Sequence, residues 1–105
     1  MKPIGPTILL SVSTVTASVS LTSVQSVPIQ AVAATNLTSG VVTYATVSLT
    51  SATVTAPTTT VAQNLVPVLG LTQDRLELQS TQTSTTVWVN AIASAAGTLA
   101  LTPLF

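Results

Sequence analysis

Few side chains in this sequence could take part in acid–base or ionic chemistry, and most of them are adjacent. Asp74, Arg75 and Glu77 lie within four positions of one another, and Lys2 is the only other charged residue. Two carboxylates can act as general acid and general base when their surroundings separate their pKa values. Asp74 and Glu77 are therefore the one pair in the sequence with the composition of a catalytic dyad.

The rest of the sequence argues against a catalytic role for this pair. There is no His and no Cys, so a hydroxyl nucleophile has no imidazole base and a metal ion has no nitrogen or sulfur ligand. Only four glycines occur, and none belongs to a phosphate-binding loop. We predict that the protein is not an enzyme and holds no metal or cofactor. Arg75 and Glu77, two positions apart, should share one face of a strand and form an ion pair or contact a partner.

Charge is scarce along the whole chain. Charged residues make up 4% of the sequence and the net charge is zero, whereas a soluble domain usually carries charge on about a quarter of its residues. Nucleic-acid binding needs clustered Lys and Arg, and a membrane helix needs an apolar run of about 18 residues. Neither feature occurs, so we expect neither nucleic acid nor a membrane as a partner. Surfaces near zero net charge tend to associate, which favours a structural protein that assembles with copies of itself.

The composition also favours β-structure. Hydrophobic residues reach 47%, and Thr occurs 21 times and Ser 12 times. Val, Ile and Thr suit a pleated surface, while Glu, Lys, Arg and Met, which favour helices, are nearly absent. High hydropathy without net charge argues against disorder. We predict an all-β fold, a single small antiparallel sandwich or barrel-like domain of about seven short strands over residues 8–105. An extended, proline-rich arm, residues 1–7, should precede it.

Alternation of apolar and hydroxylic residues locates the expected strands. Residues 15–22 alternate most regularly, and the opposite parity of Leu10 and Val12 predicts a bulge or bend near Ser13 and Thr14. Pro28 predicts an edge position for the strand that contains it. The other predicted features are strands at 27–31, 41–49, 61–69, 76–78, 87–89 and 99–104, a turn at 36–40, a loop at 57–60, and a helical turn or loop at 91–96.

The clearest predicted hairpin joins residues 76–78 to residues 87–89 through a polar turn at 80–85. Leu76 and Leu78 should point into the core, with Glu77 on the other face. Trp88 lies between two valines at the centre of its strand. A lone tryptophan at such a position is typical of a core residue or an interface anchor.

The segment that contains this hairpin, VLGLTQDRLELQSTQTSTTVWV at residues 68–89, resembles a pattern found in small virion proteins of tailed bacteriophages. In those proteins a loop with a basic residue leads into a strand that ends near Gln-Asn. A polar turn and a strand of the Val-Tyr-Val type follow. Arg75, Gln79 and residues 87–89 occupy the matching places, whereas Ser80 replaces the Asn and Gly97 alone stands for a glycine-rich tail.

The resemblance implies a capsid decoration or cement protein located on the capsid surface of a virion. Such proteins are small β-rich subunits, often homotrimers, that bind the lattice of the major capsid protein and stabilise it. Under this interpretation the arm reaches a neighbouring subunit, and its removal should weaken lattice binding without unfolding the domain. The candidate partner contacts are Lys2, Pro3, Ile4, Arg75, Glu77 and Trp88.

Two other hypotheses stay open at this point. A subunit of a tail, a spike, a filament or a surface layer would suit the Thr-rich composition. A receptor- or carbohydrate-binding module would need clustered exposed aromatic residues, and the sequence has only Tyr44, Trp88 and Phe105.

Overall fold

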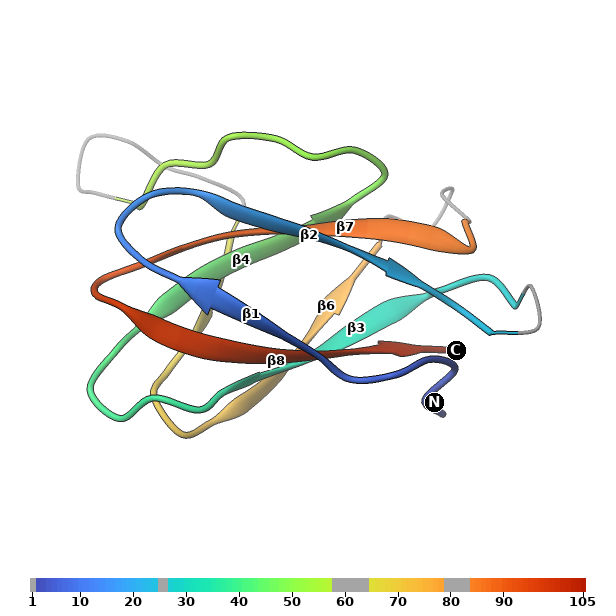
Figure 1. The fold of residues 1–105 in the computed structure, drawn as a ribbon, viewed down its shortest axis with the longest axis horizontal. Coiled ribbons are helices and arrows are strands. Elements are labelled where there is room, and N and C mark those ends of the chain that lie inside the picture. Colours follow the sequence, from blue (N-terminus) through green and yellow to red (C-terminus); the bar gives the residue numbers. More distant parts are fainter. Residues whose placement is uncertain (1, 25–26, 58–64, 79–83) are drawn as a thin grey trace.

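The computed structural model describes residues 2–24, 27–57, 65–78 and 84–105, and these residues form β-strands and no helix (Figure 1). The all-β prediction is confirmed. The described residues contain eight strands, close to the predicted number of about seven. They are β1 (Ile8–Val12), β2 (Ala17–Thr22), β3 (Ala31–Asn36), β4 (Thr43–Ser48), β5 (Val66–Val68), β6 (Gln73–Glu77), β7 (Thr86–Ala93) and β8 (Gly97–Leu104).

The strands form two four-stranded sheets that pack face to face. Sheet A has the order β1-β8-β3-β6 and sheet B the order β2-β7-β4-β5, and all the strand pairs are antiparallel. Among the described strands, only β4 and β5 are both consecutive in the chain and paired in a sheet. Every other connection crosses from one sheet to the other. Eight antiparallel strands connected in this way form a jelly roll, which is a double-sheet sandwich of two Greek keys.

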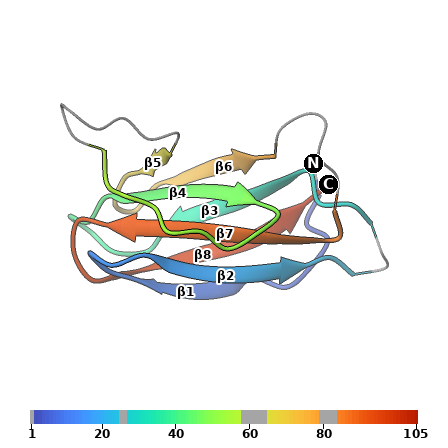
Figure 2. The same cartoon turned by 90° about the horizontal axis from the view of Figure 1, so that it is seen from above.

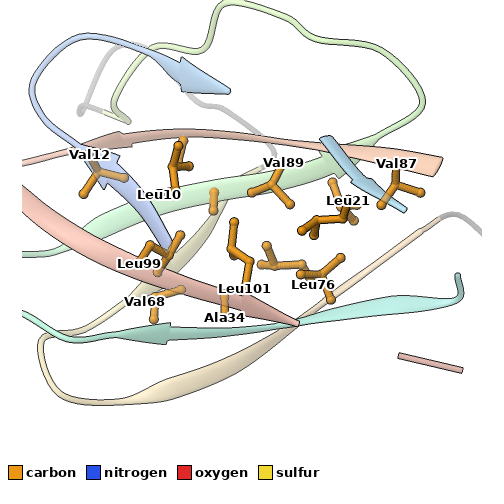
Figure 3. Packing of buried hydrophobic residues seen from close by; sticks show 14 of the residues in the cluster. Leu10, Val12, Leu21, Ala34, Val68, Leu76, Val87, Val89, Leu99 and Leu101 are labelled. Carbon is orange, nitrogen blue, oxygen red and sulfur yellow. The ribbon is translucent and has the colours of Figure 1, made fainter. Parts of the chain in front are cut away.

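The hydrophobic core lies between the two sheets and follows from the alternation of side chains along each strand. Leu10 pairs with Leu99 in sheet A, and Val19 pairs with Val89 in sheet B, so their side chains meet between the layers. Figure 3 shows ten labelled core residues that converge on this space from both sheets. The alternate residues, many of which are Ser and Thr, lie on the outer faces.

Asn36, at the end of β3, is a fully buried polar residue that fixes the loops at one end of the sandwich. Its amide nitrogen donates to the carbonyl oxygens of Val41 at 2.7 Å and Val68 at 3.0 Å. Its side-chain oxygen accepts from the backbone N–H of Thr38 at 3.0 Å. The predicted turn at 36–40 is confirmed, and Gly40 takes up the left-handed conformation there, with φ of 76°. Since Val68 belongs to β5 in sheet B, Asn36 also joins the two sheets.

The predicted hairpin between residues 76–78 and 87–89 is wrong. β6 pairs with β3 in sheet A, whereas β7 pairs with β2 and β4 in sheet B. Leu76 does point into the core, but β6 and β7 lie in different sheets, and across the sandwich β6 packs against β4 and β5. Alternation of apolar and polar residues identifies the buried face of a strand but not its neighbour in the sheet. Two strands show the same alternation whether they pair in one sheet or lie in opposite sheets. Residues 79–83, within the predicted turn, lie outside the described residues.

The predicted bulge or bend near Ser13 and Thr14 is a bend, which lies at residues 14–15 in the connection from β1 to β2 in the other sheet. The change of parity arises where the chain passes from the inner face of one sheet to that of the other. The predicted edge position near Pro28 is wrong. That proline precedes β3, and β3 lies between β8 and β6.

Of the predicted helical turn or loop at 91–96, residues 91–93 are strand and residues 94–96 are the loop that connects β7 to β8. β7 continues to Ala93 and β8 begins at Gly97, because Ala91 and Ala93 keep the inward alternation of Val87 and Val89. The predicted strands at 41–49 and 99–104 correspond to β4 and β8. Of the strand expected at 61–69, the described part is β5, while residues 61–64 and the Thr58–Thr60 run lie outside the described residues.

We expect Leu101→Ala to destabilise the fold strongly. Leu101 is fully buried on the central strand β8, and truncating such a leucine removes buried surface and leaves a cavity, at a cost of about 2–5 kcal/mol. Leu69→Ala is the matched control, because that side chain is 56% exposed and its loss should change the unfolding free energy by less than about 0.5 kcal/mol. Urea unfolding followed by Trp88 fluorescence measures both. Equal effects would contradict the assigned core.

Candidate interaction surfaces

The N-terminal arm lies along the chain's own last strand. The backbone N–H of Lys2 donates to the carbonyl of Phe105 at 2.8 Å, and that of Ile4 donates to the carbonyl of Pro103 at 2.9 Å. Lys2 and Pro3 are exposed, while Ile4 is partly buried against the core. Removing the arm would therefore break backbone hydrogen bonds and uncover core residues, so it should cost stability. This geometry changes the expectation that the domain keeps its fold without the arm.

The charged cluster lies on β6, the edge strand of sheet A. Arg75 Nε and Glu77 Oε1 are 3.8 Å apart, and the two side chains are 52% and 65% exposed. The predicted ion pair is thus present, although a solvent-exposed pair of this kind contributes less than about 1 kcal/mol. A carboxylate oxygen of Asp74 accepts from the backbone N–H of Arg75 at 2.8 Å. Both carboxylates of the cluster, Asp74 and Glu77, are exposed.

Charges on an edge strand have a well-understood physical effect. An edge strand presents unpaired backbone N–H and C=O groups to solvent, and charged side chains keep other strands from pairing with them. β5, the neighbouring edge strand of sheet B, is protected differently, since it has three residues and contains Pro67. In Figure 2, β5 and β6 lie along the same long side of the sandwich. We call β5 and β6 the protected side.

The opposite long side consists of β1 and β2 and has none of these protective features (Figure 2). No charged residue and no proline occurs between Pro6 and Pro28. Leu9 on β1 is 65% exposed, and Val15, in the connection between the two strands, is 71% exposed. We call β1, β2 and this connection the open side.

Trp88 lies on the outer face of sheet B, opposite Ser20 on β2 and Ser48 on β4. Its two neighbours Val87 and Val89 are fully buried and Trp88 itself is partly exposed. Of the two roles that the sequence left open for it, the core role is therefore wrong. Trp88 instead lines a shallow surface recess together with Thr16, Ser18, Ser51, Ala52 and Thr53, a surface that is aromatic and hydroxylic and carries no charge.

One wall of this recess is held by Asn90, a fully buried residue in the middle of β7. Its side-chain oxygen accepts from Ser18 Oγ at 2.7 Å and from the backbone N–H of Ala52 at 3.0 Å. Its amide nitrogen donates to Ser48 Oγ at 3.1 Å and to the carbonyl of Thr50 at 3.3 Å. Asn90 therefore fastens the segment after β4 across the outer face of the sheet.

Sequence reasoning missed both Asn90 and the open side. The signal for Asn90 was available, because asparagine is disfavoured in strands and this one stands between Val89 and Ala91 in an otherwise apolar run. A polar residue there must have hydrogen-bond partners. The open side could not be found in the same way, since it depends on which strands lie at the sheet edges.

Comparisons with known protein families, curated proteins and solved structures found no match. Among the described residues there is also no helix long and apolar enough to span a membrane. Function is therefore inferred from the sequence and the surfaces of this chain.

We expect Asn90→Ala to release the segment that it holds. Four hydrogen bonds are lost and buried groups are left without partners, so the unfolding free energy should fall by about 1–3 kcal/mol and amide exchange at Ala52 should accelerate. Ser18→Ala is the control, because it removes one of these bonds and leaves the one to Ala52. Hydrogen exchange measured by NMR checks both variants. Unchanged exchange at Ala52 in Asn90→Ala would contradict this role.

Proposed function

We propose that this protein is a structural subunit of a virion, a capsid decoration or cement protein that binds the lattice of the major capsid protein and associates with copies of itself. The observation that carries the proposal is the distribution of charge. Three of the four charged residues lie on one edge strand, Asp74, Arg75 and Glu77 on β6. Apart from Lys2 on the arm, the other described surfaces therefore offer hydroxyl, amide and apolar groups that suit protein contacts without charge.

The fold is compatible with this role but does not select it. Jelly rolls occur in viral capsid proteins and also in lectin domains, and a fold does not by itself determine a function. The resemblance of residues 68–89 to phage virion proteins favours the capsid role. The scarcity of exposed aromatic residues weakens the lectin alternative.

The protein would act mechanically, by opposing expansion of the capsid shell. A subunit seated between capsomers buries surface on each of them, and apolar burial contributes about 25 cal/mol per Å² before the costs of ordering are subtracted. Expansion of a shell under internal pressure would break these contacts, so their free energy opposes expansion. Trp88 is the best anchor for such a contact, because partly exposed aromatic residues often dominate interface energetics.

Shell binding tests the proposal. Purified protein should cosediment with empty capsids of its source virus in a fixed ratio. The affinity should change little between low and high salt, because few charges take part. Trp88→Ala should weaken binding by about tenfold or more, whereas Leu69→Ala, which removes an exposed side chain near the protected side, should not. Absence of binding, or a steep salt dependence, would contradict the proposal.

The same experiment separates the main alternative, a subunit of a tail, spike, filament or surface layer. Such a subunit would form open-ended polymers without any shell, because heterologous contacts that do not close produce filaments. A decoration subunit would form a small closed oligomer. Light scattering of the protein alone distinguishes the two.

A further inference from the structure

The four edge strands of this sandwich differ in whether their residues protect them against pairing with another strand. On the protected side, β6 carries Asp74, Arg75 and Glu77, and β5 is short and contains Pro67. On the open side, β1 and β2 have five and six residues and carry neither charge nor proline. Charge, proline and short length are the usual means by which β-proteins prevent edge-to-edge association. Among the four edge strands they are confined to β5 and β6, while Lys2, Pro3 and Pro6 belong to the arm that precedes β1.

The edge of β1 is suited to pairing with another strand. Within the described part of the chain, β1 pairs only with β8. In an antiparallel pair, alternate residues direct their backbone N–H and C=O groups away from the partner, so β1 presents hydrogen-bonding groups on its outer side. Leu10 and Val12 point into the core, while Leu9 and Ser11 are exposed on the other face. A strand added here would extend both the hydrogen-bond ladder and the core.

The edge of β2 is less accessible at its beginning. Thr16, just before β2, forms two hydrogen bonds with Val54. Its hydroxyl donates to the carbonyl oxygen of Val54 at 3.0 Å and accepts from the backbone N–H of Val54 at 3.2 Å. The segment after β4 therefore approaches the start of β2, and no such contact reaches β1 among the described residues. This difference makes β1 the better strand for addition, with Val15 at 71% exposure beside it.

We propose that the open side is the contact surface between copies of this chain, and that β1 is the strand through which a second copy adds to sheet A. Backbone groups of a strand edge are recognised by another strand, and the second copy offers the same edge. Net charge is zero, so copies do not repel one another. Antiparallel pairing of β1 with itself about a two-fold axis at Leu10 would place Leu9 of each copy opposite Ser11 of the other. This inference does not depend on the virion role.

A lysine placed on β1 tests the proposal by the means that natural edge strands use. Sedimentation velocity over a range of concentrations should show that the unmodified protein self-associates. Leu9→Lys should raise the dissociation constant by about tenfold or more, because symmetry brings like charges together. Gln73→Lys is the matched control, since it adds the same charge to an exposed position on β6 and should leave the dissociation constant unchanged. Ser11→Lys is a second β1 variant.

The outcomes are distinct. A dimer whose dissociation constant rises with Leu9→Lys supports pairing of β1 with β1 of a second copy. A trimer weakened by the same substitution supports pairing of β1 with β2 of the next copy. Both place the contact on the open side. A monomer at all concentrations would overturn the proposal, as would association weakened equally by Leu9→Lys and Gln73→Lys. Trp88 fluorescence and near-ultraviolet circular dichroism establish that each variant is folded.

Discussion

Unpaired backbone groups at the edges of two sheets are the constraint on which the rest of this molecule depends. A β-sandwich has open edges by construction, and with four charged residues in 105 this chain cannot protect all of them with charge. Three of its charges and Pro67 lie on one side, on β6 and β5. The side formed by β1 and β2 then remains available for contact with another chain. Scarcity of charge, which would be a liability in a free monomer, becomes consistent with a subunit that functions in an assembly.

Two buried side-chain amides hold loops and connecting segments of this protein against its sheets. Asn36 fixes the loops at one end of the sandwich, and Asn90 holds the segment after β4 against sheet B. Each lies fully buried with its hydrogen-bonding groups engaged, which is the condition under which a buried polar group stabilises a fold. The Trp88 recess therefore has firm walls made of neutral groups. Such a surface recognises partners by shape and hydrogen bonding, with little dependence on salt.

The fold class could be predicted from the sequence because composition and alternation are local properties. The same patterns placed Leu76 in the core and Arg75 beside Glu77. They could not identify sheet neighbours, since a residue such as Val87 is buried equally well whether its strand pairs with the strand of Leu76 or lies in the opposite sheet. The predicted hairpin failed for this reason, as did the edge position assigned near Pro28. In a fold where nearly all connections cross between the sheets, pairing is set by distant segments. The open side depends on strand order and was therefore also beyond a local pattern.

Hydrogen exchange of the unmodified protein at low and at high concentration tests the central claim most directly, because it locates a contact without altering the chain. Amides that pair with a second copy become protected only when the copies associate. The account predicts that residues 8–12 of β1 exchange more slowly at high concentration, while residues 73–77 of β6 are unaffected. Protection that appears on β6 and leaves β1 unchanged would contradict it.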